Sequence, residues 1–329
     1  MPTRRALAAL ALGLIGGGAG ISRAADDAST FTGRRISYDA FDRLPAESIA
    51  ADADGAVIRV AFAPSQSPEL GQRRIVDWVR ESARAVAMYY GRFPARDTRL
   101  LIVTSPGRGV GSGSAFGWRG AAIRLGLGEQ VSEIEIVRDW KLVHEMCHLA
   151  LPSMPERQRW IEEGLATYVE PLARAQAGTL DAASVWSGML RGLPNGLPQP
   201  GDRGLEHTST WGRTYWGGAL FALLADVAIR ERTGNRRSLQ HALRAILAHG
   251  NIETSSTLEP LLKIGDAAVG VSVLQELHAQ MKDAPHPVDL DALWRRLGVR
   301  LDGGGVVFDD GAPLAAVRRS LATAGRAIL

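Results

Sequence analysis

Five consecutive residues carry the clearest chemical signal in the sequence: His144, Glu145, Met146, Cys147 and His148, in the pattern H-E-x-x-H. Residues four apart lie on one face of a helix, so His144 and His148 can both direct a ring nitrogen to one metal ion. Glu145 is displaced around the helix and can reach a water on that metal, but not the metal itself. Two imidazoles with an adjacent carboxylate base are the arrangement of zinc hydrolases, so this stretch predicts a site for one Zn²⁺ ion.

The motif requires a helix, and the residues around it favour one. Segment 136–151 contains no proline or glycine, and Pro152 follows it. Apolar residues recur within it at spacings of three and four, namely Val137, Trp140, Val143, Cys147 and Leu151. This periodicity predicts one buried amphipathic helix over 136–151. Cys147 is the only cysteine of the chain and follows the apolar face, so we expect a small buried hydrophobe rather than a ligand or nucleophile.

A hydrolytic zinc ion keeps three protein ligands and one water, so a third ligand must come from a nearby segment. Residues 160–170 follow a short polar loop and predict a second helix that packs back on the first. Glu163 is the candidate ligand, and Glu162 stays open as the alternative because spacing alone cannot separate two consecutive carboxylates. Gly164 would let the two helices approach closely. Glu170 could hold a ligating histidine, although a glutamate in this setting is more often a solvated charge.

These segments resemble the gluzincin metallopeptidases, specifically the aminopeptidase N family. That family combines H-E-x-x-H with a Glu-Gly-x-Ala segment, which carries the third zinc ligand, and a Tyr-x-x-Gly-Ala segment, which carries a catalytic tyrosine. The same segments occur here in the same order, the last two at residues 163–166 and 215–219. The resemblance implies that Glu163 ligates zinc and that Tyr215 donates a hydrogen bond to the developing oxyanion.

The sequence also departs from the pattern of that family. His148 and Glu163 are 15 positions apart, a few fewer than in the aminopeptidases. No Gly-x-Met-Glu-Asn segment, which anchors the free amino terminus of an aminopeptidase substrate, precedes the motif. A glycine-rich stretch, 106–117, takes its place. We expect this stretch to be a loop bordering the cleft, because no Gly-Lys-Ser/Thr follows and a nucleotide-binding loop is therefore excluded. The resemblance thus supports the zinc chemistry rather than aminopeptidase specificity.

The rest of the chain predicts a small mixed sheet followed by a helical half. We expect strands over 56–63, 99–104 and 121–127, and a helix over 71–90. Further helices are expected over 213–232, 238–249, 269–282, 290–297 and 314–321. Together with the resemblance, this order predicts an α+β, zincin-like (thermolysin-like) catalytic domain whose active-site cleft lies between the sheet and the helical half. A sheet edge beside the metal would bind the substrate backbone.

Residues 1–24 are typical of a targeting segment. Arg4 and Arg5 precede a weakly apolar run, and residues 22–24 place small side chains at the positions that define cleavage. The arginine pair resembles a twin-arginine export signal, which predicts a periplasmic or secreted protein, with an uncleaved membrane anchor as the alternative. The apolar run is too short and too rich in glycine to span a bilayer stably. The predicted organisation is this signal peptide, an extended lead-in over 25–55, the sheet and zinc-helix part over 56–175, and the helical part over 176–329.

The charge balance argues against nucleic acid as a partner. The formal net charge of the 329 residues is +3, and cleavage after residue 24 would remove Arg4, Arg5 and Arg23 but no acid, which leaves zero. Arginine outnumbers lysine, a bias that we attribute to genome composition. The expected partner is therefore a peptide or protein substrate.

The predicted reaction is zinc-dependent hydrolysis of peptide bonds. Zinc on the three predicted ligands would lower the pKa of a water toward about 7, Glu145 would act as general base, and Tyr215 would stabilise the oxyanion. Two other functions also fit the sequence: a zinc hydrolase with a non-peptide substrate, and a non-catalytic periplasmic binding or assembly protein that retains a zinc site. His207 could assist the oxyanion, but a loop histidine is more often incidental.

Overall fold

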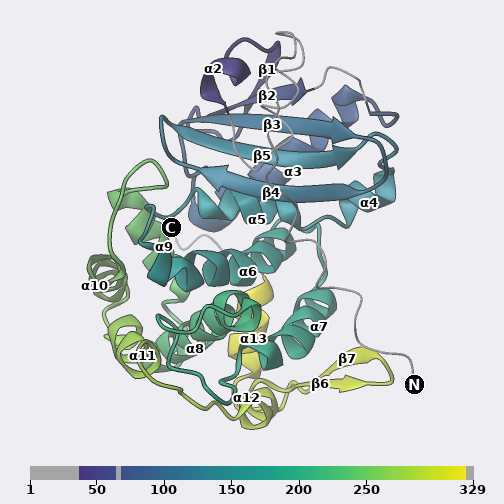
Figure 1. The fold of residues 1–329 in the computed structure, drawn as a ribbon. Coiled ribbons are helices and arrows are strands. Elements are labelled where there is room, and N and C mark those ends of the chain that lie inside the picture. The colour runs from purple at the N-terminus through teal and green to yellow at the C-terminus, as the bar shows by residue number, and fades with distance from the viewer. Residues whose placement is uncertain (1–36, 64–67, 324–329) are drawn as a thin grey trace.

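A five-stranded sheet and a mainly helical part make up the computed structural model, which describes residues 37–63 and 68–323 (Figure 1). The strands are β1 (Ala46–Ala50), β2 (Val57–Ala63), β3 (Asp97–Ser105), β4 (Val110–Phe116) and β5 (Ala121–Gly128), in the order β1-β2-β3-β5-β4. β2, β3 and β5 run parallel, whereas the edge strands β1 and β4 are antiparallel to their neighbours. The predicted signal peptide, residues 1–24, lies outside the described residues.

Burial on both faces explains the composition of the central strands. Leu100, Leu101 and Ile102 of β3 are fully enclosed, as expected for a parallel strand that is covered on both sides. α3 (Gln72–Tyr90) connects β2 to β3 and ends at Gly91, whose φ of 84° is left-handed and favours glycine. On the opposite face of the sheet, Phe41 of α2 (Tyr38–Phe41) belongs to a small separate cluster with Leu101. The predicted strands and the helix over 71–90 are confirmed.

The helix predicted over 136–151 is two helices, α4 (Glu133–Val137) and α5 (Lys141–His148). Between them the Asp139 carboxylate accepts a hydrogen bond from the Leu142 amide at 3.0 Å, which satisfies a free donor in the first turn of α5. Val137 and Trp140 are consequently 51% and 47% exposed, so the prediction that they lie on a buried face is wrong. A side-chain hydrogen bond to the backbone has competed with continuation of the helix.

Helices dominate the chain after the metal motif. They are α6 (Arg159–Gln176), α7 (Ala182–Gly192), α8 (Gly218–Arg232), α9 (Leu239–His249), α10 (Leu258–Val269), α11 (Val273–Met281), α12 (Leu290–Leu297) and α13 (Ala315–Ala322). A π-helical turn, Gly212–Gly217, leads directly into α8. The predicted helix over 269–282 corresponds to α11 alone, and neither α10 nor the hairpin of β6 (Val299–Asp302) and β7 (Gly305–Phe308) was predicted.

The described part of the segment predicted as an extended lead-in contains regular structure. Residues 37–55 include α2 and β1, and β1 pairs with β2 from Ala46 opposite Ala61 to Ala50 opposite Val57. Tyr38, Phe41 and Ile49 are buried. These apolar residues are isolated among polar ones, so they give no periodicity from which the strand could be predicted. No helix in the described ranges is long and apolar enough to cross a bilayer.

α6 and α8 cross at a pair of glycines. A Cβ atom added at Gly164 would lie 2.3 Å from the Cα atom of Gly218, and one added at Gly218 would lie 2.0 Å from the Trp160 carbonyl oxygen. We expected Gly164 to bring α6 close to the metal helix, but its close neighbour is α8. Gly164 follows Glu163, and Gly218 lies three positions after Tyr215, so this crossing controls how near those two side chains come.

Gly164→Ala is expected to lower the free energy of unfolding by about 1–3 kcal/mol, because the added methyl group overlaps backbone atoms that cannot rotate away. The matched control is Gly188→Ala in α7, where an added Cβ meets no atom within 4 Å. That substitution should raise stability by about 1 kcal/mol through helix propensity. Urea denaturation of both variants measures the contrast, and an unchanged midpoint for Gly164→Ala would contradict the close crossing.

Candidate metal centre

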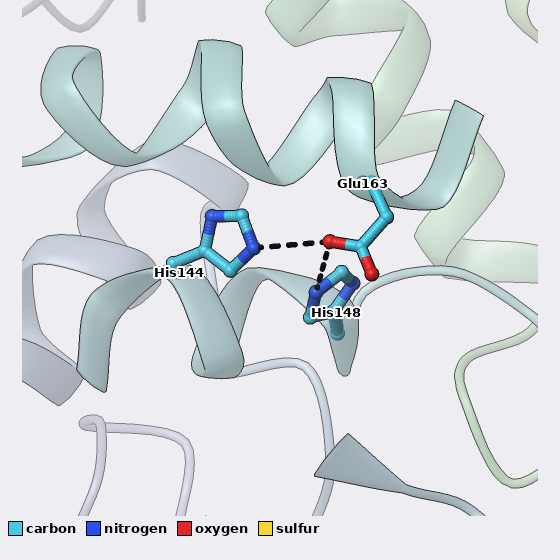
Figure 2. A group of neighbouring side chains, drawn as sticks. All are labelled: His144, His148 and Glu163. Carbon is cyan, nitrogen blue, oxygen red and sulfur yellow. Dashed lines mark hydrogen bonds and ion pairs between the residues drawn. The ribbon is translucent and has the colours of Figure 1, made fainter. Parts of the chain in front are cut away.

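The three predicted ligands lie together at the contact of α5 with α6 (Figure 2). The Nε2 atoms of His144 and His148 lie 3.3 Å and 3.5 Å from the same oxygen, Oε2 of Glu163. The donor atoms of the three residues all lie within 4.8 Å of one another. Glu162 has a different partner, since its Oε1 atom accepts a hydrogen bond from the Met154 amide at 3.2 Å. Of the two consecutive carboxylates, the fold brings Glu163 to the histidines.

The donor set fits one zinc ion. Two imidazole nitrogens and one carboxylate oxygen converge from two helices, which is the ligand combination of open, hydrolytic zinc sites. Arg159 donates to the other carboxylate oxygen of Glu163, Oε1, at 3.2 Å and 3.3 Å. This contact fixes the carboxylate with Oε2 turned toward the histidines. His144 faces Glu163 with its Nε2 atom, and its Nδ1 atom is buried with no hydrogen-bond partner in the described ranges.

Burial and the Glu163 carboxylate together determine the charges at the site. Burial would raise the pKa of Glu163, but hydrogen bonds with His144 and His148 outweigh it and hold the pKa well below its usual range. Burial lowers the pKa of His144. For His148, the effect of burial is outweighed by Glu163 and by the charge of Glu145, and the pKa is raised. An ionised Glu163 and a neutral His144 are in the protonation states that metal binding requires, whereas the raised pKa of His148 means that a metal ion would have to displace its proton.

Glu145 lies beside the edge strand β4. Burial raises the pKa of its carboxyl group to about 7, with His148 opposing the shift and Glu163 adding to it. Gly113 leaves the room that this side chain occupies, because an added Cβ would lie 2.4 Å from Glu145 Cγ and 2.6 Å from Oε1. The prediction of a loop over 106–117 is therefore wrong for residues 110–116. Gly111 and Gly113 are part of this strand, and the missing side chain of Gly113 makes space for Glu145.

Tyr215 reaches the site from the π-helical turn before α8. Its ring stacks on that of His144, with centroids 6.3 Å apart and an interplanar angle of 18°. Burial raises the pKa of Tyr215 to about 12, and the neighbouring, hydrogen-bonded Glu163 carboxylate adds to the shift while Arg159 opposes it. The hydroxyl group therefore stays protonated, as a donor, at neutral pH. A π-helical turn inserts an extra residue and is frequent at functional sites.

Two exposed tryptophans flank these rings. Trp211 is 63% exposed and stacks on Tyr215 with centroids 6.3 Å apart, and Trp140 meets His144 edge-on at 5.4 Å. A hollow of about 550 Å³ opens beside Tyr215. Its lining includes Arg157, Arg159, Trp160, Arg203, His207 and Trp211. Space for a substrate therefore adjoins the candidate metal centre.

Three residues discussed from the sequence have other surroundings. Glu170 is 7% exposed and pairs with Arg174 at 2.9 Å, so it is not a solvated charge, and its partner is an arginine rather than a ligating histidine. His207 lies 2.8 Å from Asp283 and lines the hollow. Cys147 is free and buried, as expected.

Two residues of the site were missed in the sequence. Arg159 precedes Glu163 by four positions, the spacing at which oppositely charged side chains meet on a helix, so it could have been found. Gly113 could not, because its role depends on the tertiary contact between β4 and α5.

Comparison with known proteins identifies similar folds at low sequence identity. An aminopeptidase N family protein from Idiomarina loihiensis matches with a TM-score of 0.55 and 16% identity, over 78% of this chain and 49% of that one. An M1 zinc metallopeptidase mutant from Deinococcus radiodurans matches with a TM-score of 0.48 and 16% identity, over 74% of this chain and 52% of that one. The chain thus spans about half the length of these structures. No protein-family model and no curated protein matches the sequence. The first likeness confirms the predicted zincin-like α+β fold and, at the level of the fold, the resemblance to the aminopeptidase N family.

Glu163→Gln is expected to weaken zinc binding, because an anionic ligand becomes a neutral amide. Loss of a group that only hydrogen-bonds to a metal ligand costs roughly 10–100-fold in metal affinity, and we expect loss of the ligand itself to cost more. A competition titration against a chromophoric chelator measures the affinity. Glu162→Gln is the matched control, since it makes the same chemical change one residue earlier and should leave the affinity unaltered. Equal losses in both variants would contradict the geometry described above.

Proposed function

We propose that this protein is a zinc-dependent metallopeptidase. The observation that carries the proposal is the convergence of His144, His148 and Glu163, with Glu145 and Tyr215 beside them. A zinc ion held by those three ligands supplies activation of water and stabilisation of negative charge. The likeness of the fold to an aminopeptidase N family protein supports a peptide as the substrate.

Glu145 is proposed to act as the general base. Its pKa of about 7 matches the task, because a base is most effective when its pKa lies near the working pH. The carboxylate would take a proton from the attacking water and later pass it to the leaving amine. The recess at Gly113 gives the side chain the space to do so.

Tyr215 is proposed to donate a hydrogen bond to the oxyanion that develops on the scissile carbonyl. Its hydroxyl group is protonated at neutral pH, and ring stacking against His144 and Trp211 holds its orientation. A donor that is held in place before the reaction needs no reorganisation as the charge forms.

Hydrolysis of a non-peptide substrate stays the alternative, and the choice of substrate in the experiment below distinguishes it. A purely structural zinc site is less consistent with these residues, since such sites are closed by four protein ligands and need neither a base nor a tyrosine donor. Export to the periplasm through a twin-arginine signal remains part of the proposal.

Glu145→Gln is expected to retain one zinc ion per chain and to abolish turnover of a mixed peptide library, because the amide cannot accept the proton. Bound zinc is measured by elemental analysis, and cleavage by mass spectrometry. Unimpaired cleavage by the zinc-loaded variant would refute the assignment of the base. If the unsubstituted protein cleaves an ester library but no peptide, the result favours the non-peptide hydrolase.

Tyr215→Phe removes the hydroxyl group but keeps the stacked ring. We expect kcat to fall on the order of a hundredfold or more, as for loss of one oxyanion donor, while zinc affinity is kept. Comparison of kcat with zinc stoichiometry in the same preparation tests this. A normal kcat would remove Tyr215 from the mechanism.

Gly113→Ala is expected to lower kcat on the order of a hundredfold, because the added methyl group displaces the Glu145 carboxylate and misplacement of a catalytic group by about 1 Å has such an effect. Gly305→Ala in β7 is the control, since its added Cβ meets only the Asp302 carbonyl oxygen, at 3.7 Å. Similar kinetics of the two variants would show that the recess at β4 is dispensable.

A further inference from the structure

A second hollow, of about 1140 Å³, lies away from the metal centre and shares no lining residue with the hollow beside Tyr215. The end of α3, the segment between α8 and α9, the first turns of α9 and the end of α13 surround it. Arginines are its most frequent lining residue: Arg230, Arg232, Arg236, Arg237 and Arg244. Among the described lining residues none is aspartate or glutamate.

Three of these arginines have no carboxylate partner in the part of the chain that the structure describes. Arg230 pairs with Asp226 at 2.9 Å, and Arg232 pairs with Glu276 at 2.6 Å. The other three, Arg236, Arg237 and Arg244, form no ion pair with a carboxylate in residues 37–63 and 68–323. The hollow therefore concentrates positive charge, and a bound anion would relieve the repulsion between its walls.

Hydrogen bonds hold Arg244 and the turn before Arg236 and Arg237 in place. The Arg244 guanidinium donates to the carbonyl oxygens of Tyr89 and Met88, at 2.8 Å and 2.9 Å. Arg236 and Arg237 follow a left-handed turn at Gly234 and Asn235, with φ of 59° and 61°. The Asn235 side chain accepts from Arg230 at 2.8 Å and donates to Ser320 at 2.9 Å, which ties the turn to both sides of the hollow.

The first turn of α9 adds polar side chains to the lining. Ser238 precedes this eleven-residue helix, and Ser238, Gln240 and His241 all line the hollow. The Asp226 carboxylate accepts a hydrogen bond from the Leu239 amide at 2.9 Å, so the amino terminus of this helix already has an acidic partner. The pKa of His241 is lowered by burial and by the neighbouring charges of Arg237, Arg244 and Arg230, with Asp226 opposing.

We propose that this hollow binds a ligand through a phosphate or polyphosphate group. Guanidinium groups match phosphate oxygens with paired hydrogen bonds, and serine, threonine, asparagine and glutamine side chains in the same lining supply further donors. No phenylalanine, tyrosine or tryptophan is among the described lining residues. Binding sites for single-stranded nucleic acid stack bases on such rings, so the hollow recognises the phosphate group itself. This site is independent of the zinc chemistry.

Tripolyphosphate is the probe, titrated calorimetrically into the full chain. Arg236→Gln combined with Arg237→Gln should raise the Kd for tripolyphosphate about tenfold or more, because two charge-assisted contacts are lost. The matched control is Arg73→Gln combined with Arg96→Gln. Both of these residues are exposed, neither lines the hollow, and the pair removes the same two charges. Thermal unfolding of both variants verifies that each remains folded.

A lipid headgroup would offer the same phosphate chemistry, so vesicles of phosphatidylcholine with and without phosphatidic acid form a second arm. Loss of tripolyphosphate binding in the Arg236/Arg237 variant alone supports the site with a soluble ligand. Loss of binding to phosphatidic acid vesicles in that variant alone supports it with a lipid. The proposal would be overturned if both double variants lost binding equally, or if the Arg236/Arg237 variant retained it. Absence of binding in both arms at millimolar probe would also overturn it.

Discussion

The Glu163 carboxylate is the constraint on which the site depends, because it joins its own helix, α6, to α5, the helix that carries both histidines. One of its oxygens faces His144 and His148, and the other is held by Arg159. The glycine crossing of α6 with α8 then brings Tyr215 to the same carboxylate. The packing of three helices thus determines the position, the charge and the neighbours of the Glu163 side chain. The sheet contributes only the recess that Glu145 occupies.

Burial of ionisable groups at this point has to be offset by the surrounding core. Glu145 and Glu170 both have pKa values raised to about 7 by burial, so their ionised forms are disfavoured in the folded chain. An uncompensated buried charge destabilises a fold. Here the enclosed apolar residues of α3 pack against α5 and α6, which carry these two groups, and supply the opposing free energy. The site therefore lowers the stability of the fold locally, and the main apolar cluster offsets that loss.

The sequence alone predicted whatever depends on local periodicity and on motif spacing. His144 and His148 were predicted from motif spacing, and the central strands and α3 from periodicity. The roles of Glu163 and Tyr215 were predicted from the resemblance to the aminopeptidase N family, because spacing alone left Glu162 open. Three features lay beyond it, each for a physical reason. Asp139 ends one helix and begins another through a single hydrogen bond, glycines read as a loop form a strand because β5 pairs with them, and Gly164 approaches α8 instead of α5. All three are decided by contacts between segments, which a linear pattern does not contain.

The π-helical turn at Gly212–Gly217 has a consequence for how this chain could change over evolutionary time. Each residue of a helix turns the next by about 100°. Because Gly218 is held against Gly164, deletion of one residue between Tyr215 and Gly218 would rotate the tyrosine away from Glu163 while leaving α8 in place. A lineage could therefore lose the proposed hydroxyl donor in one step and keep the fold and all three predicted metal ligands. Descendants of that kind would keep the H-E-x-x-H and Glu-Gly-x-Ala segments, while the Tyr-x-x-Gly-Ala segment would be one residue shorter and the proposed activity would be reduced.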